Sequence, residues 1–404
     1  MKKGWPTSML ADVCDVFADG DWVESKDQSP EGIRLIQTGN VGQGVFKDRG
    51  EKARYVSEAT FTRLRCTEIF EGDCLISRLP DPVGRSCLLP DTGERMITAV
   101  DCTVVRFNRK QLLPEFFNFY SQSLDYLRAV DAETTGTTRK RISRSKLGRV
   151  TIPVPPLPEQ QRIVGILDEA FGGIATTKAS DQRNLQNARA LFESHLHSIF
   201  SNRGKGWKME KLGDLFDITS SKRVFESDWK REGVPFYRAR EIVKLAQQGF
   251  VDNELFISEE MFSRYSTKYG IPAVGDIMVT GVGTLGICYV VKKDDRFYFK
   301  DGNIIWLKKK TEANSRFVEY AFRSEFLRTQ IDDSVGATVG TYTIIKAKNT
   351  LVPLPSPSEQ HRVVEQLDSL REETHSLASA YERKLTALES LKKSLLHQAF
   401  SGQL

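Results

Sequence analysis

The stretch IPVPPLPEQQRIV, from Ile152 to Val164, returns as VPLPSPSEQHRVV, from Val352 to Val364, at an offset of 200 residues. In both copies this proline-rich stretch opens a long segment that contains no further proline. Proline fits the first turn of a helix, and a glutamate there interacts favourably with the helix dipole. The two stretches therefore predict two long helices, which begin near Pro158-Glu159 and Ser358-Glu359.

The repeat extends outward over both halves of the chain. Further matches pair Trp5 with Trp207, Gly72–Ser77 with Gly275–Thr280, Val100–Val105 with Lys300–Ile305, Phe116–Val130 with Phe317–Ile331, and Ser194–Ser201 with Ser394–Ser401. Self-similarity at a fixed period indicates a repeated architecture, here a tandem duplication. The apolar spacing of Phe116–Val130 and of Phe317–Ile331 predicts a helix in each copy.

Each half contains a globular part and a helical part. In the globular parts, short strand-like runs alternate with glycine and polar turns, and one or two helical stretches lie among them, which predicts α+β domains. The predicted boundaries are residues 1–156 for the first domain, 157–203 for a central helix, 204–356 for the second domain and 357–404 for a C-terminal helix.

Apolar residues recur along both predicted helices at a spacing close to seven, which is typical of a coiled-coil seam. A helix with one apolar stripe needs a partner, and the nearest partner is the other helix, so we expect the two to pair. Thr177 and Asp181 interrupt the first seam, and Gly172-Gly173 predicts a kink. The seam residues are Ile163, Leu167, Ile174 and Leu191 in the first helix and Val363, Leu367, Leu370, Leu388 and Leu395 in the second.

The composition is that of an ordinary globular protein. Of the 404 residues, 40% are hydrophobic and 27% charged, and the formal net charge of +5 is a weak pointer to an anionic partner. No apolar run approaches the length of a membrane span, so we expect a cytoplasmic protein. The six cysteines form no C-x-x-C pair, which favours reduced, buried thiols over a disulfide framework or a zinc site.

The sequence offers no catalytic motif. All five histidines lie in the two helical segments, so neither globular domain can assemble a Ser-His-Asp or Cys-His site. The stretch GVGTLG, from Gly281 to Gly286, resembles a dinucleotide fingerprint, but a strand-like run follows it where a helix is required, which predicts a hairpin connection instead. Pro90–Met96 has two acids but lacks the lysine of a nuclease site, so a surface turn is favoured. We therefore expect a binding protein with no catalytic residue, no metal site and no cofactor of its own.

The binding chemistry is clearest from Thr134 to Arg149, where six basic residues and no acidic one lie between Arg139 and Arg149. Such a segment can place several charges on a phosphate backbone while its hydroxyl groups contact phosphate or base edges, although a solvated basic turn is the alternative. Its counterpart, Val335–Lys346, keeps one lysine and loses the arginines. The candidate DNA contacts here are Arg139, Lys140, Arg141, Arg144 and Lys146 in the first copy and Thr341, Tyr342 and Lys346 in the second.

Other candidates lie at the ends of predicted strands. Amide side chains suit adenine and arginine suits guanine in the major groove, but these loops are equally compatible with plain domain edges. They are Gln37, Thr38, Asn40 and Arg78 in the first copy and Arg238, Arg240, Thr280 and Thr284 in the second.

The duplicated plan, the two P-x-P-x-x-x-E-Q stretches and the paired strand motifs resemble the DNA specificity subunit of type I restriction-modification systems over essentially the whole chain. The resemblance implies two target recognition domains that read a bipartite, asymmetric double-stranded DNA sequence. It also implies an antiparallel helix pair that acts as a spacer and binds two modification subunits, which use S-adenosylmethionine to methylate adenine. Restriction subunits, which use ATP and Mg, would join that core.

One departure is PDPVGR at residues 80–85, where the family tends to have a Gly-Thr-x-Gly turn. The alternative is a protein-interaction scaffold that acts through its helix pair.

Overall fold

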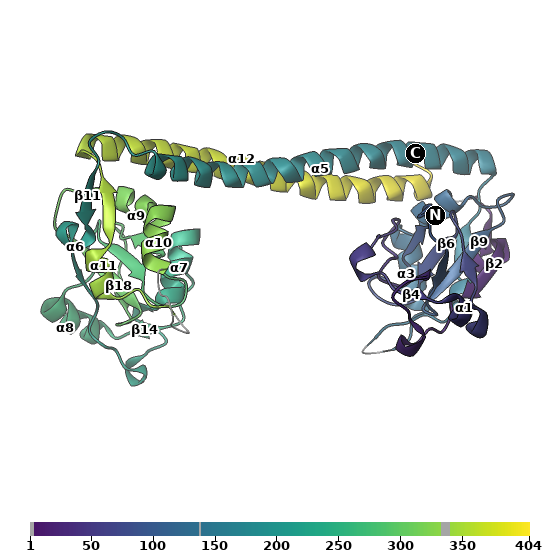
Figure 1. The fold of residues 1–404 in the computed structure, drawn as a ribbon, viewed down its shortest axis with the longest axis horizontal. Helices are drawn as coiled ribbons and strands as arrows, with labels where there is room; N and C mark the ends of the chain where they lie inside the picture. The colour runs from purple at the N-terminus through teal and green to yellow at the C-terminus, as the bar shows by residue number, and fades with distance from the viewer. Residues whose placement is uncertain (1–3, 137–138, 333–339) are drawn as a thin grey trace. The chain divides into compact units, whose positions relative to one another are not determined.

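The computed structural model describes residues 4–136, 139–332 and 340–404. The chain divides into two compact units. Unit 1 comprises Met1–Gln182 and Arg383–Leu404, and unit 2 comprises Arg183–Glu382. Each unit therefore contains one globular domain together with part of each long helix (Figure 1).

The globular domain of unit 1 is built on two sheets. One is antiparallel, with the strand order β2-β9-β6-β7, and the other has the order β4-β3-β8-β5, in which β3 and β8 are parallel. The strands are β1 (Thr7–Met9), β2 (Cys14–Asp19), β3 (Ile33–Ile36), β4 (Tyr55–Val56), β5 (Glu68–Ile69), β6 (Cys74–Ser77), β7 (Ser86–Leu88), β8 (Met96–Thr98), β9 (Cys102–Phe107) and β10 (Thr151–Pro153). The α-helices are α1 (Glu58–Leu64), α2 (Pro114–Tyr120), α3 (Leu124–Ala132), α4 (Arg144–Gly148) and the long α5 (Leu157–Ser201).

The globular domain of unit 2 repeats this plan. Its four-stranded antiparallel sheet has the order β12-β18-β15-β16, and its second sheet has the order β14-β13-β17 with β13 and β17 parallel. The strands are β11 (Lys208–Lys211), β12 (Phe216–Thr219), β13 (Val234–Tyr237), β14 (Phe256–Ile257), β15 (Ile277–Thr280), β16 (Cys288–Val290), β17 (Tyr298–Phe299), β18 (Ile304–Lys309) and β19 (Leu351–Leu354). The α-helices are α6 (Leu212–Leu215), α7 (Ala239–Gln248), α8 (Glu259–Tyr269), α9 (Ser315–Arg323), α10 (Glu325–Asp332), α11 (Ile344–Asn349) and the long α12 (Pro357–Ser401). The predicted α+β duplication with two long helices is confirmed.

The stretch predicted to be helical in each globular domain is helical, but it is divided into two helices. Residues 116–130 form the end of α2 and most of α3, and residues 317–331 form α9 and α10. A serine causes each break. The Ser123 hydroxyl accepts a hydrogen bond from the Tyr126 N–H at 3.2 Å, and the Ser324 hydroxyl accepts one from the Leu327 N–H at 3.4 Å. A serine hydroxyl that satisfies a free N–H starts a new helix, and apolar periodicity alone does not register this competition.

In each globular domain the first strand pairs with the last. Strand β1 is antiparallel to β10, and β11 is antiparallel to β19. The chain therefore enters and leaves each domain at one place, directly before the long helix begins. This arrangement closes each domain on itself, and in the chain the second domain lies between α5 and α12.

A buried glutamine fastens each long helix to its domain, which explains the glutamine of the repeated Glu-Gln pair. The Gln160 side chain accepts a hydrogen bond from the Leu113 N–H at 2.8 Å and donates to the carbonyls of Gln111 and Pro155 at 2.8 and 2.7 Å. Gln360 accepts from the Asn314 N–H at 2.8 Å and donates to the Pro355 carbonyl at 2.9 Å. Both glutamines are almost fully buried. Because a buried amide needs hydrogen-bond partners, this residue type is required at the joint.

We expect Gln160→Ala to destabilise the protein, because it removes a buried side chain and leaves the Leu113 N–H without its acceptor. The expected cost is about 1–3 kcal/mol, or about 2–4 °C of melting temperature per kcal/mol in a unit of this size. Gln161→Ala is the matched control, since Gln161 is the same residue type one position along and is exposed. Thermal unfolding followed by circular dichroism compares the two variants. Equal melting temperatures for both would show that the joint contributes little.

Both ends of the predicted seam are buried. In unit 1, Ile163 and Leu167 of α5 share a core with Leu396 and Phe400 of α12. In unit 2, Val363 and Leu367 share a core with Leu196, Phe200 and their neighbours. Aromatic residues connect these ends to the globular cores: the ring centroids of Phe400 and Phe116 are 5.5 Å apart in unit 1, and those of Phe200 and Phe317 are 5.4 Å apart in unit 2. The helix pair and the domain of each unit therefore form one continuous core.

Ion pairs give the direction of the helix pairing. In unit 1, Lys178 pairs with Glu389 and Asp181 pairs with Lys384, so residue numbers rise along α5 as they fall along α12, and the helices are antiparallel. Asp181, predicted as an interruption of the seam, has a side chain that is only 3% exposed and lies 2.9 Å from the Lys384 ammonium nitrogen. A buried polar group in a helix seam specifies the register of pairing.

Leu191 is not a buried seam residue. It is 51% exposed, whereas Ala188, Phe192 and Leu196 are buried in unit 2. On a straight α-helix with 3.6 residues per turn, every seventh residue is displaced by about 20° around the helix axis. Counting in sevens therefore selected a residue on the wrong side of the helix. Helix α5 also runs unbroken through Gly172-Gly173. The remaining predicted seam residues are partly buried: Ile174, Leu370, Leu388 and Leu395.

Candidate nucleic-acid interface

The ends of three strands lie close together at one end of the four-stranded sheet of unit 1. Asp19 ends β2, Asp101 directly precedes β9, and Arg78 directly follows β6. The antiparallel register aligns Asp19 with Thr103 and Ser77 with Cys102, which brings the three side chains to the same end of the sheet.

Arg78 is an internal residue rather than a surface one. Its side chain is 5% exposed, lies 3.2 Å from Asp19 Oδ1, and donates a hydrogen bond to the Val100 carbonyl. Burial lowers the pKa of the Arg78 guanidinium, and the charges of Asp19 and Asp101 act in the opposite direction. The prediction that Arg78 contacts DNA stays a prediction, but its guanidinium is already used inside the domain.

The basic segment forms a hairpin followed by a short helix. Thr135 and Arg141 exchange two backbone hydrogen bonds of 2.9 and 2.8 Å, and the Ile142 N–H donates to the Arg78 carbonyl at 3.2 Å. The Ser143 hydroxyl accepts from the Lys146 N–H at 3.3 Å and caps α4. Residues 137–138 of this segment lie outside the described residues. The hairpin therefore places Arg141 beside the strand ends that carry Arg78 and Asp101.

Acids of the same domain pair with four of the six cations. Arg139 and Arg149 are exposed and have no ion-pair partner among the residues that the structure describes. The four ion pairs are Lys140–Asp131 at 2.6 Å, Arg141–Asp101 at 2.7 Å, Arg144–Asp19 at 3.6 Å and Lys146–Glu133 at 3.8 Å. All four cations remain at least 40% exposed. In the two lysine pairs the acid is exposed as well, at 60% and 50%. Exposed pairs of this kind are weak, so an arriving phosphate can compete for these two lysines.

The duplicated lysine has a structural explanation. Lys146 Nζ donates to the Glu133 carbonyl at 3.2 Å, and Lys346 Nζ donates to the Ile331 carbonyl at 2.8 Å. These carbonyls lie at the ends of α3 and α10, where a cation interacts favourably with the helix dipole. A role for Lys146 or Lys346 in DNA binding stays a prediction, because the shared position follows from this capping contact.

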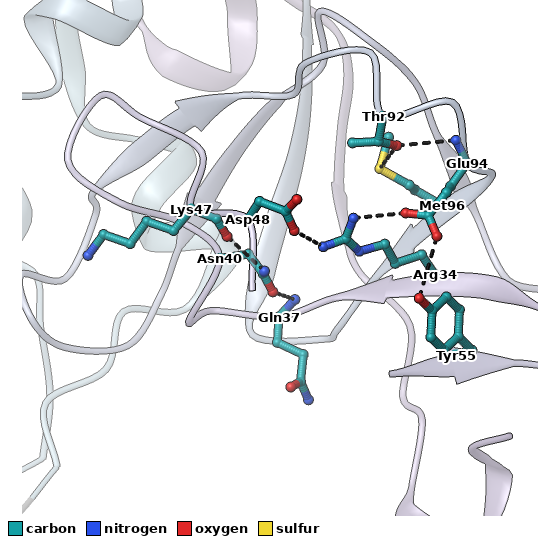
Figure 2. A network of polar contacts seen from close by, with 9 residues as sticks. All are labelled: Arg34, Gln37, Asn40, Lys47, Asp48, Tyr55, Thr92, Glu94 and Met96. Atoms are coloured by element: carbon teal, nitrogen blue, oxygen red, sulfur yellow. Dashed lines mark hydrogen bonds and ion pairs between the residues drawn. The ribbon is translucent and has the colours of Figure 1, made fainter. Parts of the chain in front are cut away.

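In the turn after β3, the two amide side chains that were candidates for DNA contact have different roles (Figure 2). Asn40 is 8% exposed; its Oδ1 accepts from the Gln37 N–H, and its Nδ2 donates to the Lys47 carbonyl, both at 3.0 Å. The Gln37 side chain points away from this network. Thr38 is partly exposed, and its carbonyl accepts from Arg85 at 2.8 Å. Asn40 is thus committed to the turn, while Gln37 has the side chain that can reach a partner.

Arg34 is a charged residue that the sequence reasoning missed. Its side chain is 6% exposed, lies 2.8 Å from Glu94 Oε2 and also pairs with Asp48 (Figure 2). A buried charge requires a partner, so an arginine inside the apolar run of β3 was the available signal. This network also assigns Glu94, one of the acids of the predicted surface turn, to an ion pair.

In unit 2 the arginine candidates hold the start of α7. Arg238 lies 3.1 Å from Glu241, and Arg240 pairs with both Glu241 and Glu254. The Glu241 side chain is 3% exposed, so its two arginine partners compensate a buried charge. Arg240 remains half-exposed and is the better placed of the two for an outside partner.

The GVGTLG stretch connects the antiparallel strands β15 and β16, so the predicted hairpin is confirmed. Thr280 is fully buried; its hydroxyl donates to the Thr284 carbonyl and accepts from the Ile287 N–H. Tyr342 is 2% exposed, with its hydroxyl 2.8 Å from that of Thr350. Thr284 and Thr341 are exposed. Residues 335–339 of the predicted counterpart segment lie outside the described residues.

The six cysteines are free, and five of them are buried. Burial raises the pKa of the Cys66 thiol to about 11, which keeps it protonated and unreactive at neutral pH. Within residues 4–136, 139–332 and 340–404, no group of three or more His, Cys, Asp or Glu side chains could hold a metal ion. Over the same ranges, no helix is both long and apolar enough to cross a membrane.

Comparison with known proteins identifies related sequences and folds. The family described as "Type I restriction modification DNA specificity domain" matches residues 2–183 and 204–386. A Haemophilus influenzae protein named as a type I restriction enzyme specificity subunit is 25% identical over 60% of this chain and 61% of its own length. The EcoBI specificity subunit of Escherichia coli is 24% identical over 71% of this chain and 65% of its own length. The chain thus spans less than two thirds of either relative.

Two solved structures share the fold. One, from work on complex assembly and conformational transition of the type I R-M system, covers 100% of this chain and 99% of its own, with a TM-score of 0.76 and 19% identity. The HsdS subunit from Thermoanaerobacter tengcongensis covers 100% of this chain and 98% of its own, with a TM-score of 0.62 and 18% identity. At these identities the likeness concerns the fold.

Proposed function

The chain belongs to the family of type I restriction modification DNA specificity proteins, and we propose that it is the DNA-recognition subunit of such a system. Each globular domain reads one half of a bipartite, asymmetric double-stranded target in the cytoplasm. The helix pair binds two modification subunits, and restriction subunits join this core. Chemistry resides in these partners, which use S-adenosylmethionine for methylation and ATP and Mg for restriction, while this chain supplies recognition without catalysis.

The observation that carries the proposal is that the two globular domains share one fold but carry different charged side chains on their surfaces. The sheets β2-β9-β6-β7 and β12-β18-β15-β16 correspond strand for strand. The segment that carries Arg139, Arg141 and Arg144 in unit 1 has no arginine in its counterpart in unit 2, where Lys346 takes the position of Lys146. Base contacts come from side chains on such a frame, so two copies with different side chains suit two different half-sites.

Exposed leucines on the long helices support the partner-binding role. Leu191 is 51% exposed in α5, and Leu377 and Leu391 are 44% and 46% exposed in α12. Helices that already bury one stripe gain from a partner that covers a second one. The same leucines would serve the alternative function, a protein-interaction scaffold, which differs in having no affinity for DNA.

Binding to duplex DNA over a salt series separates the two functions. We expect the logarithm of affinity to fall steeply with the logarithm of salt concentration, and changing Arg139, Lys140 and Arg141 together to alanine should weaken binding and reduce the slope by about one unit per lost phosphate contact. The control removes Arg109 and Lys110, two exposed cations at the far end of strand β9, and should change the slope little. An unchanged slope in the triple variant would show that the segment points away from DNA, and wild-type protein without salt-dependent binding would favour the scaffold.

A further inference from the structure

The five charged residues at the strand ends of unit 1, which we call the Arg78 cluster, form three layers. The members are Asp19, Arg78, Asp101, Arg141 and Arg144. Arg78 is innermost, with 5% of its side chain exposed, followed by Asp101 and Asp19 at 29% and 37%. Arg141 and Arg144 are outermost, at 46% and 47%. The buried Arg78 guanidinium pairs with Asp19, and its backbone N–H bonds to the Asp101 carbonyl. Each carboxylate in turn pairs with one exposed arginine of the basic segment.

The backbone ties these layers together. The Arg78 N–H donates to the Asp101 carbonyl at 2.9 Å, and the Arg78 carbonyl accepts from the Ile142 N–H at 3.2 Å. The residue after Asp101 begins β9, and Asp19 ends β2, so both carboxylates extend from ordered strands. Groups held on a rigid element present their partners more reproducibly than groups on a free loop.

The outer arginines keep donors for a second partner. In its ion pair, Arg141 Nη2 lies 2.7 Å from Asp101 Oδ1. A guanidinium carries several N–H donors in a fixed planar fork, so one edge can face a carboxylate while another meets a phosphate or the edge of a guanine. The cluster has one more cation than anions, and this surplus is small. The carboxylates therefore reduce general attraction to phosphate while they orient the arginines.

We propose that Asp101 and Asp19 are positioning residues of the DNA interface, which set the specificity of the first domain by holding Arg141 and Arg144 in place. The proposal rests on the proposed function, because it assumes that the basic segment meets DNA. A free arginine neutralises any phosphate within reach, whereas a pinned arginine contacts only DNA that is docked in one register. The carboxylates thereby increase the discrimination between target and other DNA, because the arginine side chains are already ordered before DNA binds.

Within the described residues, unit 2 keeps only part of this arrangement: Asp301, the counterpart of Asp101, pairs with the exposed Arg223. The match of Gly72–Ser77 with Gly275–Thr280 places Gly281 at the position of Arg78, so the second copy lacks the buried arginine at the centre of the cluster. Loss of Asp101 should therefore affect only the half-site that the first domain reads. A general loss of folding would reduce recognition of both half-sites.

Asp101→Asn tests the proposal, and Asp131→Asn is the matched control. Both variants remove one negative charge beside a cation of the same segment, but the Asp131–Lys140 pair is exposed on both sides and lies outside the cluster. The probes are a duplex carrying the sequence that methylation-site sequencing identifies and the same duplex with the first half-site scrambled. Both variants should bind the scrambled duplex a few-fold more tightly. Only Asp101→Asn should lose discrimination between the two duplexes, by about tenfold, within the range expected for one lost side chain–base contact.

Two further measurements keep the outcomes distinct. Arg141→Lys retains the charge but lacks the fork that serves two partners, so it should lose discrimination like Asp101→Asn without a gain in affinity for scrambled DNA. Equal behaviour of Asp101→Asn and Asp131→Asn would overturn the proposal, as would a parallel loss of affinity for both duplexes together with a lowered melting temperature. If the triple alanine variant also binds DNA normally, the contact of the basic segment with DNA is itself wrong.

Discussion

Exchange of residues 207–353 for the corresponding domain of another family member should change one half of the methylated sequence and leave the other half unaltered. The structural reason is the closed form of the domain. Strands β11 and β19 pair at its boundary. Gln360 lies just beyond the exchanged segment and bonds to a backbone N–H inside it, that of Asn314, which a donor domain also supplies. The measurement is methylation-site sequencing of DNA from cells that produce the hybrid with the modification subunits.

The design of the hybrid follows from the core of unit 2. Phe200 of α5 packs on Phe317 of the exchanged domain, and Val363 and Leu367 of α12 belong to the same core. The donor should therefore have an aromatic residue at the position of Phe317. A reciprocal exchange of residues 5–153 is the control and should change the opposite half. If either exchange alters both halves, the domains do not read independently.

The second large effect concerns spacing. Insertion of seven residues after Gln182 in α5 and seven after Glu382 in α12 should keep both half-sites and add about three unread base pairs between them. These points are the boundaries of the two units, so the Asp181–Lys384 and Arg189–Glu382 pairs keep their partners. Seven residues preserve the seam, because the apolar repeat is close to seven. They lengthen a helix by about 10 Å at ~1.5 Å per residue, comparable to three DNA steps of ~3.4 Å.

The readout must allow for rotation about the duplex. Three added steps turn one half-site by roughly a quarter turn or more, given about 10.5 base pairs per turn, so total methylation can fall even when the spacing follows the helices. The observable is therefore the spacing that residual methylation selects from a library of variable spacers. Insertion into α5 alone is the control, because it leaves the seam out of register. Selection of the original spacing by the double insertion would show that the helices do not set it.

The elements that the sequence predicted correctly are those with local causes. A proline and a glutamate mark the first turns of α5 and α12, and glycines mark the β15–β16 hairpin. Leu191 was misplaced because its exposure depends on the exact helical phase after several turns. The breaks at Ser123 and Ser324 were missed because one hydroxyl competes there with an apolar pattern.

The candidate site was predicted in part for a related reason. The basic character of residues 139–149 is visible in the sequence, but the acids that pair with Arg141 and Arg144 lie far away in the chain, at Asp101 and Asp19. These acids and arginines come together only because the ends of β2 and β6 and the start of β9 lie side by side in the folded sheet. Lys146 and Lys346 match in sequence and cap equivalent helices, so their equivalence has a structural explanation that the sequence alone does not show.

The two glutamine joints have a consequence for the symmetry of recognition. Gln160 and Gln360 fasten their domains through the same kind of contact, an N–H just before or at the start of a helix and a proline carbonyl. Because the two glutamine joints are alike, a copy of the first domain should fit in the position of the second domain. A gene that carried the first domain twice would then encode a protein whose target repeats one half-site, so that an asymmetric recognition sequence becomes a symmetric one without a single new base contact.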